Sequence, residues 1–195
     1  MAVLKVPVTP DDHIQGNEDA PVTVVEYGDY ECPHCGIAYY IVKSLQKQYG
    51  RLLRLVFRNF PLAELHPHAE SAAEAAEFAA DYGRFWDMHD GIYENQQRLG
   101  TPLLFELAAL LDLPATALRR VLMTQGYATK IGYDFLAGVR SGVNGTPAFF
   151  INNVRHDASY EFQELVSAID DRLWANQECG LTGQLQISEG GQTCE

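Results

Sequence analysis

The alternation of apolar and polar residues predicts a strand, a helix and a second strand in the first third of the chain. Val22 to Tyr27 is a β-branched run that is typical of a strand, and from Pro33 to Tyr49 apolar residues recur at helical spacing. Gly50 is a suitable stop for that helix, and residues 53–57 alternate again like a strand. This order predicts the beginning of a βαβ unit, in which a helix connects two parallel strands.

The middle of the chain, residues 62–142, has only helical periodicity. The expected helices lie at 69–80, near 85–92, at 101–111, 114–122 and 131–139. Strand character returns over 147–151, and an Asn152-Asn153 turn leads to a short strand at 154–156 and a closing helix over 162–173. Residues 1–20 are expected to form an irregular arm, and residues 177–195 a flexible tail.

Composition limits the classes of partner. The chain has 195 residues, of which 47% are hydrophobic, and a formal net charge of −12, which argues against nucleic acid or an anionic membrane as a partner. No apolar run approaches the length of a membrane span, and residues 1–10 lack the features of a signal peptide. We therefore expect no nucleic-acid partner, no membrane insertion and a cytoplasmic location, with a periplasmic or extracellular location as the alternative if a signal peptide was removed.

The candidate chemistry lies where the first predicted helix begins. Cys32 and Cys35 are separated by two residues there, and the unpaired N–H groups and positive dipole of a helix N-terminus stabilise a thiolate. The second sulfur is near enough to form a small disulfide with the first. We interpret the pair as a thiol–disulfide redox centre.

A zinc site is the alternative for this pair, because two cysteines at the same spacing also open zinc knuckles. Such a site needs two more ligands. Cys179 and Cys194 lack the spacing of a second knuckle, and His66 and His68 are expected to be solvated in a loop near prolines. The role of Cys179 and Cys194 is left open.

Glu26 is out of place in the first predicted strand. It is in phase with Val22 and Val24, so it points into the core if they do. Two interpretations follow from the pattern: an edge position where the carboxylate reaches water, or a buried acid near the cysteines that accepts or passes a proton.

The sequence resembles the DsbA-like family of thiol–disulfide oxidoreductases, in its small bacterial branch, over about residues 12–174. The strongest points are the segments Glu26 to Cys35, Phe85 to Asp90 and Gly142 to Pro147. The resemblance implies an α/β thioredoxin fold with an inserted all-helical domain. Residues 12–61 and 143–176 would form the discontinuous thioredoxin-like domain, and residues 62–142 the insertion.

The resemblance also implies roles for individual residues. Cys32 matches the attacking cysteine and Cys35 the buried resolving cysteine, with Pro33 and His34 as the dipeptide between them. Glu26 matches a buried acid near the pair, which favours the second interpretation of this residue.

The resemblance places a substrate-binding segment opposite the cysteines. Pro147 matches a proline that the family holds in the cis form, and the backbone next to Thr146 would pair with an extended substrate.

The predicted function is exchange of the Cys32–Cys35 dithiol or disulfide with protein or peptide cysteines, through a mixed disulfide. Beyond this disulfide we expect no cofactor and no metal, and an unidentified redox partner would restore the pair. The helix N-terminus, and the His34 imidazole if it reaches the sulfur, should lower the pKa of Cys32 and give oxidant character. A redox-inert isomerase or transferase of the same fold is a further alternative, although such relatives usually keep a single serine or cysteine.

Overall fold

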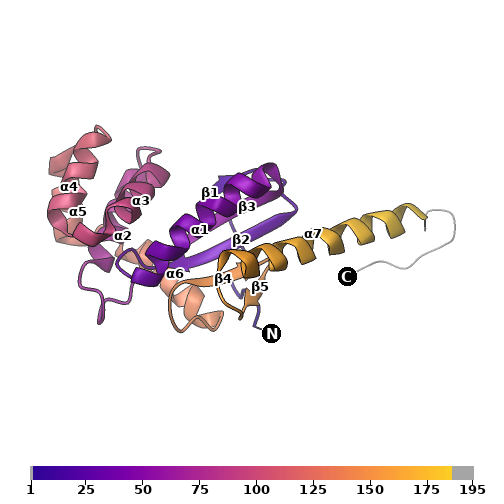
Figure 1. Ribbon diagram of the computed structural model, residues 1–195. Helices are drawn as coiled ribbons and strands as arrows, with labels where there is room; N and C mark the ends of the chain where they lie inside the picture. The colour runs from indigo at the N-terminus through magenta and orange to yellow at the C-terminus, as the bar shows by residue number, and fades with distance from the viewer. Residues whose placement is uncertain (1, 186–195) are drawn as a thin grey trace.

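The structure is a computed structural model that describes residues 2–185, and a five-stranded sheet lies at the centre of this part of the chain (Figure 1). The strand order is β1-β3-β2-β4-β5, with β2 and β3 parallel and the other neighbours antiparallel. The strands are β1 (His13–Gly16), β2 (Val22–Gly28), β3 (Leu53–Asn59), β4 (Ala148–Ile151) and β5 (Val154–His156).

One face of the sheet is covered by the helix that joins β2 to β3 and by the last helix. The first of these, α1 (Pro33–Tyr49), makes the predicted βαβ crossover, with a short 3₁₀ turn η1 (Gly50–Leu52) behind it. The last helix is α7 (Phe162–Leu185). Leu45 of α1 and Leu165 of α7 share one core with Val24 of β2, so both helices pack on the same face (Figure 1).

The opposite face is covered by α6 (Ala128–Arg140) and the N-terminal arm. Val25 and Tyr27 of β2 lie in this second core together with Phe60, which stacks on Phe135 of α6 with ring centroids 4.3 Å apart. Because both faces of β2 are buried, its apolar run is nearly continuous rather than strictly alternating.

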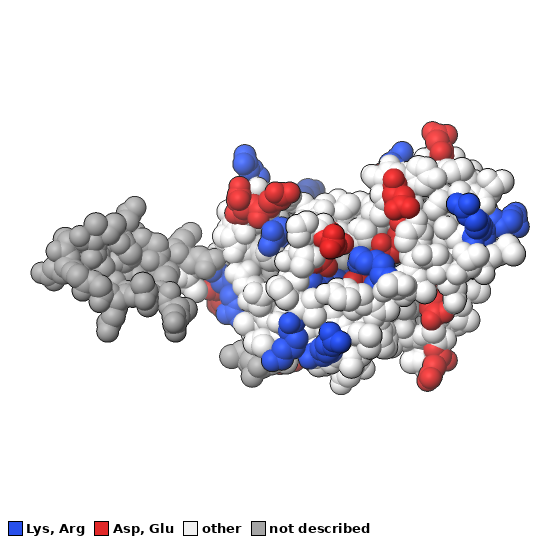
Figure 2. All heavy atoms as spheres, turned by 180° about the vertical axis from the view of Figure 1, so that it is seen from behind, with Lys and Arg blue, Asp and Glu red and all other residues white. Residues whose placement is uncertain are grey.

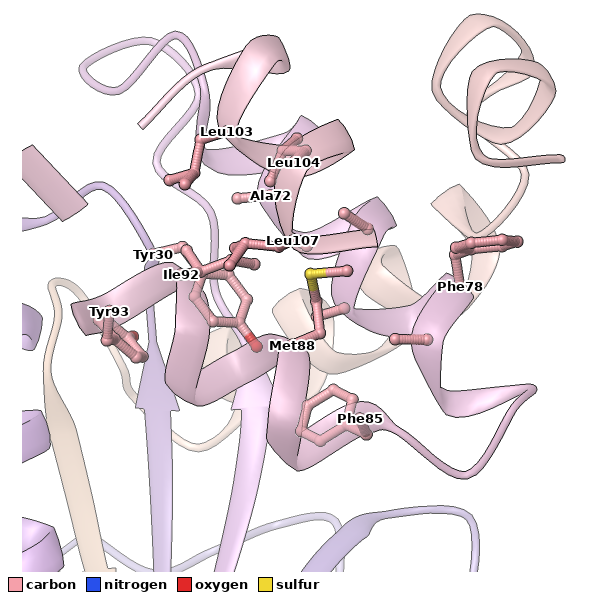
Figure 3. Close-up of a cluster of buried hydrophobic side chains, with 14 of the residues drawn as sticks. Tyr30, Ala72, Phe78, Phe85, Met88, Ile92, Tyr93, Leu103, Leu104 and Leu107 are labelled. Carbon is pink, nitrogen blue, oxygen red and sulfur yellow. The ribbon is translucent and has the colours of Figure 1, made fainter. Parts of the chain in front are cut away.

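The predicted block of helices follows β3. It consists of α2 (Ala69–Ala80), α3 (Phe85–Glu94), the 3₁₀ turn η2 (Gln96–Arg98), α4 (Thr101–Leu110), α5 (Ala115–Thr124) and α6. The helices α2 to α5 surround a core of their own, in which Met88, Ile92 and Leu104 are fully buried (Figure 3). Cys32 and Cys35 belong to this same core, so the helical block reaches the cysteine pair.

The arm and the closing helix differ from the expected elements, while the flexibility of residues 177–195 stays a prediction. Within the arm, His13–Gly16 forms the strand β1. The sequence does not indicate this strand, because it has four residues and Ile14 is its one strongly apolar side chain, which is too short a run to show alternation. At the other end α7 continues to Leu185, because Ala, Gln, Glu and Leu residues favour helix there despite two glycines. The rest of the predicted tail, including Cys194, lies outside the described residues.

Charged side chains of both signs are spread over the face of the molecule that Figure 2 shows. On the face that Figure 2 shows, Lys and Arg side chains are interspersed with Asp and Glu and form no continuous basic area. None of the helices within residues 2–185 has the length and apolarity needed to cross a lipid bilayer.

A buried ion pair fixes the N-terminal arm to the sheet. Arg58 of β3 contacts Asp12 through Nε–Oδ1 at 2.7 Å and Nη2–Oδ2 at 2.9 Å, and it also donates to the carbonyls of Val6 and Pro7 and to the hydroxyl of Tyr27. Burial acts to raise the pKa of Asp12, but the Arg58 guanidinium outweighs it, and the pKa is lowered. Removing either partner would leave an uncompensated charge in the interior.

We expect Asp12→Asn to lower the free energy of unfolding at pH 7 by roughly 3–5 kcal/mol, the usual cost of breaking a buried pair. The matched control is Asp87→Asn, which removes the exposed pair with Arg84 and should cost at most about 1 kcal/mol. Urea-induced unfolding of the three proteins measures both. In the wild type the contribution of ionised Asp12 to the free energy of unfolding should disappear as the pH falls through the lowered pKa of Asp12. Equal losses of stability in Asp12→Asn and Asp87→Asn would contradict the assignment of a buried ion pair.

Candidate active site

The turn between β2 and α1 places the two cysteines. Cys32 is the N-cap residue of α1, and Pro33 occupies the first helical position, where its missing N–H costs nothing. Both thiols are free, and the relative exposure of Cys32 is 5% and that of Cys35 is 0%. The pair therefore lies at a helix N-terminus, as the sequence predicts, but below the surface of the molecule.

The environment of Cys32 favours its thiolate. Its pKa is lowered to about 5, chiefly by a hydrogen bond from the Cys35 thiol; burial acts in the opposite direction, and Thr146 and the backbone N–H groups of Cys35 and His34 lower it further. The two N–H groups belong to the first turn of α1, which is the predicted effect of the helix N-terminus. At pH 7 Cys32 is therefore mainly ionised.

The His34 side chain is not arranged as expected. Its Nδ1 lies 2.8 Å from the hydroxyl of Tyr160, a residue in the loop before α7, and the two rings meet edge to face. His34 acts on Cys32 through its backbone N–H. The imidazole is thus held by Tyr160, a partner that no sequence pattern indicates.

Cys35 and Glu26 form the buried side of the site. The Cys35 sulfur accepts a hydrogen bond from the N–H of Asp29 at 3.4 Å, and burial raises its pKa well above the ordinary value. Glu26 is 3% exposed, and burial raises its pKa to about 8. The edge interpretation of Glu26 is therefore wrong, because the carboxyl group is in the interior and its charge contributes to the raised pKa of Cys35.

The segment before β4 lies against Cys32. The peptide bond between Thr146 and Pro147 is cis, and the Thr146 carbonyl accepts a hydrogen bond from the Cys32 thiol at 3.4 Å. The Thr146 hydroxyl is buried and has no hydrogen-bond partner among the described residues. The hydroxyl is therefore available to donate to a Cys32 thiolate, and Thr146 lowers the pKa of Cys32.

Asp29 is an organising residue that sequence reasoning missed. The residue is 1% exposed. Its Oδ1 accepts a hydrogen bond from the N–H of Glu31 at 2.8 Å. Its Oδ2 accepts a hydrogen bond from the N–H of Leu62 and is paired with Nδ1 of His66, both at 2.8 Å. His66, expected to be solvated, is held by this contact, and Asp29 outweighs burial to raise its pKa. A Gly-Asp pair in the turn before the helix was the available signal.

Gln96 of η2 is a second residue that was missed. Its Nε2 donates to the carbonyls of Tyr30 and Cys32 at 2.8 and 2.9 Å. Gly36 makes this approach possible, because an ideal Cβ there would lie 2.2 Å from Gln96 Oε1. The helical block therefore holds the backbone of the cysteine turn directly.

No group of three or more His, Cys, Asp or Glu side chains is arranged to hold a metal ion within the part of the chain that the structure describes. The zinc alternative consequently finds no further ligands for Cys32 and Cys35 in this part.

The comparisons with known proteins agree with this geometry. A family model described as Thioredoxin matches residues 8–171. The Na(+)/H(+) antiporter NhaA 1 of Salinispora arenicola is 45% identical over 167 residues, which are 85% of this chain and 26% of that protein. The chain thus spans about a quarter of the length of the curated relatives that it matches.

Solved structures show the same arrangement of elements. BdbD from Bacillus subtilis, in its oxidised form, is similar with a TM-score of 0.78 and 27% identity, covering 88% of this chain and 98% of that one. The α-DsbA1 protein of Wolbachia pipientis has the same fold, with a TM-score of 0.74 at 22% identity, over 86% of this chain and 93% of that one. Because the family match extends over most of the residues and the folds of these solved structures coincide with it, the protein belongs to the thioredoxin family.

Proposed function

We propose that the protein is a thiol–disulfide oxidoreductase that exchanges its Cys32–Cys35 dithiol or disulfide with the cysteines of protein or peptide substrates. The observation that carries this proposal is the difference between the two sulfurs. The pKa of Cys32 is lowered to about 5, while burial raises the pKa of Cys35. At neutral pH the Cys32 sulfur is a thiolate nucleophile, and Cys35, the more deeply buried of the two, is held as a thiol.

In the reductive direction the Cys32 thiolate attacks one sulfur of a substrate disulfide. A bond forms between Cys32 and the substrate, the substrate S–S bond breaks, and its second sulfur leaves as a thiolate. Cys35 then loses its proton and attacks Cys32, which forms the Cys32–Cys35 disulfide and releases the remaining substrate sulfur. Two electrons pass from the protein to the substrate, and oxidation of a substrate dithiol is the same path reversed.

Glu26 is the proton acceptor that we propose for the second attack. Its carboxyl group is buried on the Cys35 side, with a pKa raised to about 8. A carboxyl group that titrates near neutral pH takes up and returns a proton more readily than one with an ordinary pKa.

The low pKa of Cys32 also suggests a direction for the reaction. It makes Cys32 a good leaving group and stabilises the reduced protein, so we propose a centre more oxidising than thioredoxin. Thr146 supports this because it lowers the pKa of Cys32, and the backbone beside Pro147 would pair with an extended substrate. A redox partner, not identified by these observations, would restore the starting state, and a cytoplasmic location is part of the proposal.

The curated relatives are named antiporters, but this chain matches only about a quarter of their length. Our proposal for this chain rests on the dithiol within the matched length and assigns it no ion transport.

The first test is a titration of Cys32 in the reduced protein. We expect thiolate absorbance near 240 nm to appear with a midpoint at about pH 5 and to be lost as the pH falls through that value, because the folded protein favours the thiolate. The Cys32→Ser variant should lack this transition, since the raised pKa of Cys35 keeps its thiol protonated at neutral pH. A midpoint at the ordinary thiol value, near 8.5, would contradict the site's electrostatics.

The second test traps the intermediate. Cys35→Ala removes the sulfur that resolves the mixed disulfide, so a peptide disulfide should leave a stable covalent adduct on Cys32, detectable by mass spectrometry under non-reducing conditions. Cys32→Ala is the matched control and should form no comparable adduct, because Cys35 is inaccessible and protonated. Failure of the wild type to exchange with any peptide disulfide or with oxidised glutathione would refute the proposed function.

The third test concerns Glu26. In Glu26→Gln the mixed disulfide should resolve roughly 10²-fold more slowly at pH 8, the lower end of the contribution usual for a positioned base. In the wild type the resolution rate should rise as the pH passes about 8, and the variant should lack this step. Single-turnover release of peptide thiol measures both, and a variant with an unchanged rate and pH profile would leave Glu26 a structural role only.

A further inference from the structure

A groove of about 550 Å³ opens beside the cysteine turn, on the side of α1 that faces the end of α3. It is bounded by the turn itself, by the first turns of α1 and by η2, and Pro33 and Gly36 belong to its lining. The cis segment Thr146–Pro147 is not among the residues that line it. The groove is therefore separate from the segment that the resemblance assigns to substrate.

Two large apolar side chains are exposed in this groove. Ile37 and Tyr40 lie three residues apart on one face of α1, with 55% and 58% of their surfaces accessible, and Pro33 continues this face toward Cys32. Two adjacent apolar side chains exposed at a concavity offer a surface on which an apolar side chain of another polypeptide can pack.

The charge of the groove is of one sign. Glu31 and Glu94 line it, and no Lys, Arg or His does. Glu94 is exposed at the end of α3 and accepts a hydrogen bond from the Tyr39 hydroxyl at 3.2 Å, which directs its carboxylate. A partner with a basic side chain next to an apolar one would complement both features of the surface.

The groove is joined to the reactive sulfur through the backbone. Gln96 forms part of its wall, and its Nε2 donates to the carbonyl of Cys32 at 2.9 Å. Glu31 precedes Cys32 in the chain, and Pro33 follows it. A chain bound in the groove thus lies a few residues from the disulfide that Cys32 attacks.

We propose that this groove binds the substrate polypeptide next to its reacting cysteine, and that it selects a segment with an apolar residue and a Lys or Arg. This rests on the proposed function and specifies its substrate class. The apolar side chain packs on Ile37 and Tyr40, and the cation approaches Glu94 with Glu31 adding to the negative potential.

The test uses two synthetic peptides that differ in one residue. Each carries a cysteine in a mixed disulfide with glutathione, flanked by Leu and Lys in one peptide and by Leu and Glu in the other. With reduced glutathione present to restore the Cys32–Cys35 dithiol after each turnover, the wild type should reduce the Lys peptide with a kcat/KM about 3- to 5-fold higher, the ratio that an exposed ion pair of up to 1 kcal/mol gives. Glu94→Lys should reverse this preference, and Glu94→Gln, which keeps an acceptor for Tyr39, should weaken it, because Glu31 remains.

Asp171→Lys is the control, because it makes the same change of net charge at an exposed position of α7 and should keep the wild-type preference. Replacing the peptide Leu by Ser should lower kcat/KM for the wild type more than for Ile37→Ser. Absence of a preference in the wild type, or an equal change in Glu94→Lys and Asp171→Lys, would overturn the groove proposal. If the wild type reduced neither peptide nor oxidised glutathione, the proposed function itself would fail and the groove proposal with it.

Discussion

A thiolate with little access to water must receive its hydrogen bonds from the protein, and this requirement governs the arrangement around Cys32. Cys32 is 5% exposed, so water supplies few of the donors that an anion needs. The Cys35 thiol and two N–H groups of α1 replace them, and Thr146 lowers the pKa of Cys32 further. These groups come from two segments more than a hundred residues apart, and the pKa of Cys32 is lowered only while the fold keeps both in place.

The fold holds these groups through polar contacts at the end of the sheet. Asp29 ties the turn before α1 to the loop that follows β3, and Gln96 ties the carbonyl of Cys32 to the helical block. The register of β2 with β4 brings the Thr146 segment to the same end. The helical block is therefore more than a cover over the site, because its core contains the cysteines and its η2 turn fixes their backbone.

The parts of this arrangement that follow from local pattern were predictable, and the parts that depend on distant contacts were not. Helical spacing located α1, and the Asn152-Asn153 pair indicated a turn whose two residues do adopt positive φ values of 46° and 67°. Period-two alternation put Glu26 in phase with its apolar neighbours but could not say whether the strand was central, and the sheet order places β2 between β3 and β4. The contact between His34 and Tyr160 joins residues with no shared pattern, so sequence alone could not reveal it.

Burial of the Glu26 carboxyl group lowers the stability of the fold, and the proposed chemistry of the site gives a reason for keeping it. A carboxyl group whose pKa is raised to about 8 in the folded protein binds its proton more tightly there than in the unfolded chain. The folded state therefore loses about 1.4 kcal/mol of stability for each pH unit between the ordinary carboxyl pKa and the raised one, and the full penalty applies above it. Burial is the one cause of the shift, so no cation offsets the charge. An apolar residue would fill the position without this penalty, as Val22 and Val24 do on the same face of the strand. Under the proposed function, the acid adds a proton acceptor on the buried side of a thiol that must lose its proton once in each cycle.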